Sequence, residues 1–291
     1  MTTTTTTLTL DVPGASIAYD VWGPVPTPDG RPPLLVIGQP MTASGFTTLA
    51  SLLPDRTVVT YDPRGLGRSV RTDGSSTNSP QQQAEDLHAL VAALGAGPVD
   101  LFATSGGAVT ALQWVSTHPD DVRTLVAHEP PLLAFLPDAE QALAAERNVQ
   151  EAYQLRGWGA GMAQFIALTS WQGEFPDGFG SEPVDPAAFG LPTDDDGSRG
   201  DPLLSGVSNA VTAYQPDVAA LAGASTRVVV VAGIESRGSV TWRTSAALAD
   251  ALGQELAVFP SHHSGFAGDE FGYPGQPEAF AARLRAVLDD R

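Results

Sequence analysis

Several residue types are missing from this sequence, and each absence removes a class of chemistry. The chain of 291 residues has no cysteine, which excludes disulfide bonds, thiolate catalysis and cysteine-ligated zinc. Its fifteen basic residues are all arginine, so lysine Schiff bases and a phosphate-binding loop with its lysine are excluded as well. No apolar run approaches the roughly eighteen residues that a membrane-spanning helix needs.

Positive charge is also scarce. The net charge of −18 argues against nucleic acid and anionic membranes as partners, because both bind positively charged surfaces. The first ten residues, MTTTTTTLTL, have neither the basic nor the apolar region of a secretory signal. We therefore expect a cytoplasmic protein whose partner is a small-molecule substrate. The sequence leaves the oligomeric state open.

Short apolar segments rich in β-branched residues alternate with helical patterns along most of the chain. Two early segments, 8–12 and 16–22, are predicted as antiparallel edge strands. The buried strands that follow are predicted at 34–38, 57–62, 99–103, 122–129, 228–233 and 255–260, and the helices at 80–94, 108–117, 241–252 and 277–288. This alternation predicts an α/β fold, with a mostly parallel eight-stranded sheet and helices on both of its faces.

The alternation is interrupted after Glu129. Two predicted helices, 138–156 and 159–171, are followed by a loop rich in glycine, proline and aspartate. Ligands of open α/β sheets bind at the carboxyl ends of the strands, so an insertion here is expected to form a helical cap over that edge. The expected domains are a core of residues 1–130 and 226–291 and a cap of residues 131–225.

Ser105 lies where a predicted strand changes directly into a helix, within VDLFATSGGAVTALQW (99–114). Gly106 and Gly107 allow a sharp turn at this point, because glycine has no Cβ atom. Two interpretations stay open. The turn is either a nucleophile elbow, which pushes the serine hydroxyl clear of the sheet, or an ordinary helix start capped by serine.

A nucleophilic serine requires a general base, and the base requires a carboxylate that orients it. His262 and His263 follow the last predicted strand, at the same edge of the sheet as Ser105. Neighbouring parallel strands lie about 4.8 Å apart. The carboxylate of Glu129, at the end of the strand after the Ser105 unit, is therefore expected to reach the histidine. Glu235, which follows the next strand, is the alternative acid.

Side chains alternate between the two faces of a strand. His128 precedes Glu129 directly in a predicted strand, so His128 is expected to point away from the site. The remaining histidines, His88 and His118, are expected to be a solvated helix residue and a helix cap.

Backbone N–H groups near the serine are expected to form an oxyanion hole. Gly106 supplies one N–H group, and Gln39, in the turn after the strand at 34–38, supplies the other. Met41 is expected to line the acyl pocket beside this turn. Aromatic residues of the cap suggest an apolar substrate pocket, although aromatic residues at helical spacing more often belong to a core. The substrate-binding candidates are Met41, Trp158, Phe165 and Trp171.

Four motifs in order along the chain resemble those of the α/β-hydrolase superfamily: IGQP, YDPRGLGRS, ATSGG and FPSHHSGF. The resemblance extends from Leu8 to the end of the chain. It implies the α/β-hydrolase fold, with Ser105 as the nucleophile. It also implies that His263, the residue before the turn at 264–266, is the catalytic histidine.

The acidic residue departs from the usual pattern of the superfamily. The acid usually follows the seventh strand, in a turn whose last position is Ser236 in this chain. Members similar to haloalkane dehalogenases carry it after the sixth strand instead, where Glu129 fits. Those enzymes use an aspartate nucleophile, so the serine of this chain argues against dehalogenase and epoxide hydrolase activity.

These observations predict a serine hydrolase with a Ser-His-Glu triad and no need of a cofactor or a metal. The expected substrate is a carboxylic ester, thioester or lactone of small to medium size and largely apolar character. Three alternatives stay open. The same triad serves carbon–carbon bond hydrolases and acyltransferases or cyclases, and a hydrolase fold can also bind a ligand without catalysis.

Overall fold

One twisted sheet runs through the computed structural model, which describes residues 4–290. Its strands follow the order β1-β2-β4-β3-β6-β7-β8-β9, and a two-residue strand, β5, pairs with β2. β2 pairs antiparallel with β1, β4 and β5, whereas the strands from β4 to β9 along this order are parallel. The strands are β1 (Thr5–Val12), β2 (Ala15–Trp22), β3 (Leu34–Gln39), β4 (Val58–Tyr61), β5 (Val70–Arg71), β6 (Val99–Ser105), β7 (Val122–His128), β8 (Arg227–Gly233) and β9 (Ala257–Phe259).

The predicted fold class is confirmed, and β5 is an addition that the sequence pattern did not predict. Both faces of the sheet are buried, because successive residues of β3 enter different cores. Leu35 belongs to the core under α2 and α3, whereas Leu34 belongs to the core under α1 and α9. The helices that flank the sheet are α1 (Thr47–Ser51), α2 (Pro80–Leu94), α3 (Gly106–Thr117), α7 (Val218–Gly223), α8 (Val240–Ala251) and α9 (Pro277–Asp289).

Helix α2 shows why some of these boundaries were predictable. The Ser79 hydroxyl accepts a hydrogen bond from the Gln82 N–H group at 3.2 Å, and Pro80 occupies the first helical position. Gly95 ends the helix with a φ of 63°, a left-handed conformation that glycine adopts without a steric penalty.

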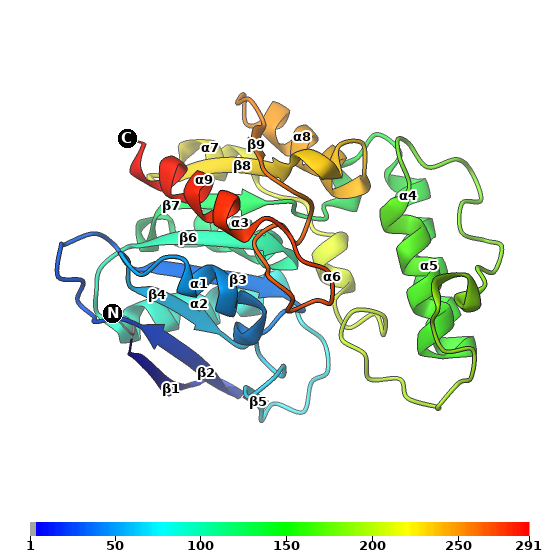
Figure 1. The fold of residues 1–291 in the computed structure, drawn as a ribbon, viewed down its shortest axis with the longest axis horizontal. Coiled ribbons are helices and arrows are strands. Elements are labelled where there is room, and N and C mark those ends of the chain that lie inside the picture. The colour runs from blue at the N-terminus through cyan, green and yellow to red at the C-terminus, as the bar shows by residue number, and fades with distance from the viewer. Residues whose placement is uncertain (1–3, 291) are drawn as a thin grey trace.

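The insertion between β7 and β8 stands apart from the layers around the sheet. Helices α4 (Ala139–Arg156) and α5 (Trp158–Ser170) lie beside the sheet, and the short helix α6 (Asn209–Thr212) lies between them and the sheet (Figure 1). The insertion has an apolar core of its own, which includes Tyr153, Leu168 and Leu204. It is joined to α8 by an ion pair between Arg243 and Asp138.

In the part of the chain that the structure describes, single turns of 3₁₀ helix occur at five further places. They are Ala43–Phe46, Pro119–Asp121, Leu133–Phe135, Pro186–Phe189 and Ile234–Ser236. Within residues 4–290, no helix combines the length and the apolar character required to cross a membrane.

Candidate active site

Ser105 ends β6 in a strained conformation. Its φ is 55°, which is uncommon for a residue other than glycine and marks functional turns. Its hydroxyl forms no capping hydrogen bond with the described residues of α3, so the ordinary cap interpretation does not account for the serine.

Close packing against β3 explains the two glycines after Ser105. A Cβ atom on Gly107 would lie 2.6 Å from the Cα atom of Gly38, and one on Gly106 would lie 2.9 Å from the carbonyl oxygen of Gln39. Side chains at either position would push α3 away from β3. The small residues are therefore required for the sharp change from strand to helix.

His263 and Glu129 meet across the edge of the sheet. The Nδ1 atom of His263 lies 2.6 Å from the Oε2 atom of Glu129. Glu129 is fully buried. It accepts further hydrogen bonds from the Gly233 N–H group at 2.9 Å and the Thr241 hydroxyl at 2.7 Å. The carboxylate is thus held in a fixed orientation, with one oxygen directed at the imidazole.

The surroundings of Glu129 keep it ionised. Burial alone would raise its pKa, but the hydrogen bond and charge of His263 outweigh burial, with help from the Ser236 hydroxyl. The pKa of Glu129 is therefore well below its usual range. At neutral pH the residue is a carboxylate that accepts the Nδ1 proton of His263.

The prediction that His128 points away from the site is wrong. Its Nε2 atom lies 4.0 Å from the Oε1 atom of Glu129, and its ring stacks on that of His263 with 5.9 Å between centroids. Side chains alternate only while the backbone is extended, and Glu129 has a φ of 48°. Burial, opposed by the Glu129 charge, lowers the pKa of His128 to about 4. The buried ring beside the site is therefore neutral at pH 7.

Glu235, the alternative acid, lies elsewhere on the rim of the site. Its Oε1 atom accepts a hydrogen bond from the Gln276 side chain at 2.9 Å. Of the two candidate acids, the structure brings Glu129 into contact with His263.

Ser105 and His263 line the same cavity, which has a volume of about 560 Å³. Gln39 and Gly106, the predicted oxyanion residues, line it beside them, and Gln39 is the strand partner of Ser105. The Gln39 side chain is held at both ends. Its Oε1 atom accepts a hydrogen bond from the Gln83 side chain of α2 at 2.6 Å. Its Nε2 atom donates a hydrogen bond to the Ser208 hydroxyl of the insertion at 3.2 Å.

Phe165 lines this cavity, but the other three substrate-binding candidates do not. Met41 lines a separate hollow, because its side chain packs against the core under α1 and α9. The Trp158 indole donates to Asp201, within the insertion, and the Trp171 indole donates to the Glu174 carbonyl oxygen. Both tryptophans therefore stabilise the insertion itself.

Two polar residues of the cavity, Glu146 on α4 and Thr212 on α6, were not singled out from the sequence. The sequence predicts the helix that carries Glu146, but it does not show which face of that helix turns toward the sheet.

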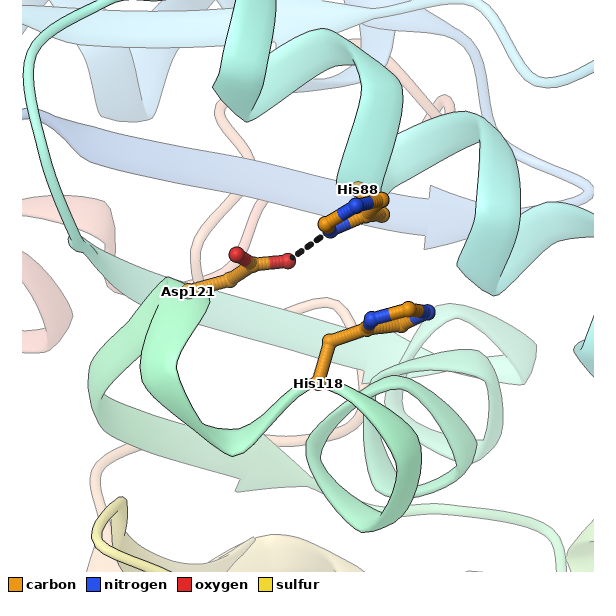
Figure 2. Close-up of side chains that lie close together, drawn as sticks. All are labelled: His88, His118 and Asp121. Carbon is orange, nitrogen blue, oxygen red and sulfur yellow. Dashed lines mark hydrogen bonds and ion pairs between the residues drawn. The ribbon is translucent and has the colours of Figure 1, made fainter.

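A cluster of potential metal ligands lies away from the cavity. His88, His118 and Asp121 hold ligand atoms within 4.8 Å of one another. Figure 2 shows the two imidazole rings one above the other, with their centroids 4.0 Å apart and 13° between their planes. Imidazole binds a metal through a lone pair in the plane of its ring, so stacked rings do not direct both lone pairs at one ion.

Hydrogen bonds account for the same cluster. Asp121 accepts from the His88 Nδ1 atom at 2.6 Å and from the Trp114 indole at 2.9 Å. These bonds join α2 to α3 and to the turn that precedes β7. We assign the cluster to holding these elements together.

Comparison with known proteins identifies related sequences. Residues 32–163 match the family described as alpha/beta hydrolase fold. YraK, an uncharacterized hydrolase of Bacillus subtilis (strain 168), is 38% identical over 129 residues, which are 44% of this chain and 46% of the relative. A proline iminopeptidase of Xylella fastidiosa (strain 9a5c) is 30% identical over 100 residues, 34% of this chain and 32% of the relative. The matches span less than half the length of these curated relatives.

Solved structures match the whole fold. A thermophilic esterase from Thermogutta terrifontis has a TM-score of 0.64 at 21% identity, with 98% of each chain covered. A loop variant of the haloalkane dehalogenase DbeA from Bradyrhizobium elkanii has a TM-score of 0.62 at 20% identity, with 98% of this chain and 96% of that chain covered. These matches show that the chain has the α/β-hydrolase fold, as its sequence motifs predict.

Proposed function

We propose that this protein is a serine hydrolase that cleaves a carboxylic ester, thioester or lactone with Ser105, His263 and Glu129. One observation carries the proposal. A buried, ionised Glu129 holds the Nδ1 atom of His263 at 2.6 Å, and His263 shares a cavity with a serine in a strained turn. In this arrangement Ser105 is the nucleophile, His263 the base and Glu129 the acid that orients the base.

The geometry supports the following sequence of steps. Because Glu129 accepts the Nδ1 proton, the Nε2 atom of His263 is free to take the proton of the Ser105 hydroxyl as its oxygen attacks the substrate carbonyl. The negative charge that develops on the carbonyl oxygen is stabilised by the N–H groups of Gln39 and Gly106. His263 then donates its proton to the leaving alcohol or thiol, and an acyl-enzyme remains.

Water completes the reaction. His263 accepts a proton from the water molecule that attacks the acyl-enzyme, and returns it to Ser105 as the acid is released. The insertion of residues 131–225 acts as a cap in this proposal. It supplies apolar cavity walls such as Phe165 and Leu168, which suit a substrate of small to medium size.

Covalent labelling with a fluorophosphonate probe tests the proposal. We expect the wild-type protein to be labelled at Ser105 and to hydrolyse short-chain esters. Ser105→Ala should abolish labelling and lower kcat by about four to six orders of magnitude. Near-full ester hydrolysis by Ser105→Ala would contradict the assignment of the nucleophile.

The same experiment separates the alternatives. An unlabelled wild-type protein that still binds ligands in the cavity would indicate a hydrolase fold without catalysis. Labelling without ester hydrolysis would favour carbon–carbon bond cleavage or acyl transfer, which a panel of diketones and of acyl acceptors would then distinguish.

A further inference from the structure

The charged groups of the catalytic cavity are unevenly distributed. Two glutamates, Glu146 and Glu235, line it, and among residues 4–290 no arginine does. Glu235 is exposed at the rim and already accepts a hydrogen bond from Gln276. Glu146, on α4 of the insertion, is partly buried. A substrate that enters the cavity therefore meets negative charge in addition to the apolar walls.

Glu146 has few partners for a carboxylate in such a position. The Thr212 hydroxyl lies 2.7 Å from each of its two oxygens, and a hydroxyl has a single proton to donate. Within the described residues 4–290, no arginine lies within ion-pair distance of this carboxylate. A carboxylate can accept about four hydrogen bonds, so most of its capacity is left for another donor.

The ionisation of Glu146 reflects this shortage of partners. Burial raises the pKa of Glu146 to about 7, against the opposing effects of the Thr212 hydroxyl and the Arg147 charge. A cation that binds beside such a carboxyl group stabilises its ionised form.

Helix α6 connects Glu146 to the proposed nucleophile. Thr212 ends α6, and its neighbour Val211 lies 3.2 Å from the position that a Cβ atom on Gly106 would occupy. Figure 1 shows α6 between the sheet and α4. One short helix therefore separates the carboxylate from the turn of Ser105, and a substrate of moderate length spans the two.

We propose that Glu146 and Thr212 form a subsite for a protonated amine, so that the preferred substrate is an ester that carries a cationic nitrogen. The inference rests on the proposed function and names its substrate class. The carboxylate accepts charge-assisted hydrogen bonds from the ammonium group, and Val149, Phe165 and Leu168 contact the hydrocarbon chain between the amine and the ester.

Ligand binding tests the subsite independently of catalysis. Isothermal titration of Ser105→Ala compares hexylammonium with hexanol, which has the same number of non-hydrogen atoms and is uncharged. We expect hexylammonium to bind about tenfold more tightly. Adding Glu146→Gln should remove this difference, whereas adding Glu151→Gln, which removes an exposed carboxylate from the same helix, should preserve it. Equal affinities for the two ligands, or a preference that survives Glu146→Gln, would overturn the subsite.

Kinetics extend the test to substrates. Two pairs of esters carry an ammonium group or a methyl group at the end of an equally long chain, one pair on the acyl side and one on the alcohol side. For the wild-type protein at about pH 8, where Glu146 is ionised, we expect a higher kcat/KM for the ammonium member of at least one pair. Glu146→Gln should abolish that preference and Glu151→Gln should not.

The outcomes separate the two proposals. Hydrolysis of the neutral esters without any ammonium preference would overturn the amine subsite and leave the serine hydrolase intact. Tight binding of hexylammonium without hydrolysis of any ester would support the subsite and contradict the proposed reaction. Thermal unfolding of each variant verifies that it is folded.

Discussion

Two glutamates at the same cavity, Glu129 fully buried and Glu146 partly buried, differ in almost every respect. Glu129, at the end of β7, accepts hydrogen bonds from a backbone N–H group, a hydroxyl and an imidazole. Glu146, on α4 of the insertion, has one hydroxyl beside it. The pKa of Glu129 is lowered and that of Glu146 is raised. The difference shows that donors, rather than burial, decide which carboxylate is ionised.

The comparison also separates two roles. The donors around Glu129 come from the chain itself, so its charge is already balanced, and in the proposed mechanism it orients His263. Glu146 lacks such donors among the described residues, and we infer that the substrate supplies them. In the two proposals, the hydrogen bonds of Glu129 are complete within the protein, whereas those of Glu146 are completed by a bound substrate.

The largest expected effect comes from neutralising Glu129. Glu129→Gln keeps an acceptor for the N–H group of Gly233, but its amide no longer holds the proton of His263 on Nδ1. We expect kcat for ester hydrolysis to fall by about three to four orders of magnitude, measured by steady-state kinetics. Glu235→Gln serves as the control and should stay within about twofold of the wild type. The opposite result would assign the acid role to Glu235.

A smaller effect is expected on acid stability. The pKa of Glu129 is lower in the folded chain than its ordinary value of 4.5, so its ionisation stabilises the fold above that pH. This stabilisation is lost as the pH falls from about 4.5 toward the folded pKa. Glu129→Gln has no such dependence. The difference in unfolding free energy between wild type and variant should therefore shrink by about 2 kcal/mol on acidification.

Urea unfolding at a series of pH values measures this difference. Other carboxylates also titrate, among them Asp62 and Asp138, but they are present in both proteins and cancel in the comparison. A difference that stays constant between neutral and acidic pH would show that the Glu129 carboxylate is not specifically stabilised in the fold.

The sequence predicts much of the sheet edge because short-range rules govern it. The sequence pattern predicts the helix at 80–94, which the structure confirms as α2, and strand spacing indicates that Glu129 reaches His263. The error at His128 has a local cause. Side chains point to opposite faces of a strand only where the backbone is extended. Glu129 has a φ of 48°, so its backbone is not extended and its side chain does not point away from that of His128.

The insertion was harder to predict for a different reason. Its two long helices are visible in the sequence, but the face of α4 that meets the cavity depends on how α6 folds back against Gly106. That contact joins residues more than a hundred positions apart, and no local pattern encodes it. Phe165 lines the cavity, as expected, but Trp158 and Trp171 do not. Composition and spacing give no sign of this difference between the three aromatic residues.

The smallest predicted effect is on the thermal stability of Glu146→Gln. Because the folded pKa of Glu146 is about 7 and its ordinary value is 4.5, the folded state binds a proton between these values that the unfolded state releases. Stability is therefore lost as the pH rises through this window. Glutamine resembles the protonated carboxyl group and does not titrate, so the Glu146→Gln protein does not lose this stability as the pH rises. We expect Tm of Glu146→Gln to exceed that of the wild type by about 2–4 °C above neutral pH, and the two to converge near pH 4.5.

Scanning calorimetry with and without hexylammonium sharpens this last measurement. The ammonium ion should raise Tm of the wild type more than that of Glu146→Gln, because it balances the carboxylate that glutamine replaces. Glu151→Gln, on the same helix, should match the wild type in both conditions. A Glu146→Gln protein less stable than the wild type above neutral pH would mean that the carboxylate already has adequate partners. Glu146 would then not differ from Glu129 in its supply of hydrogen-bond donors, and the amine subsite would have no basis.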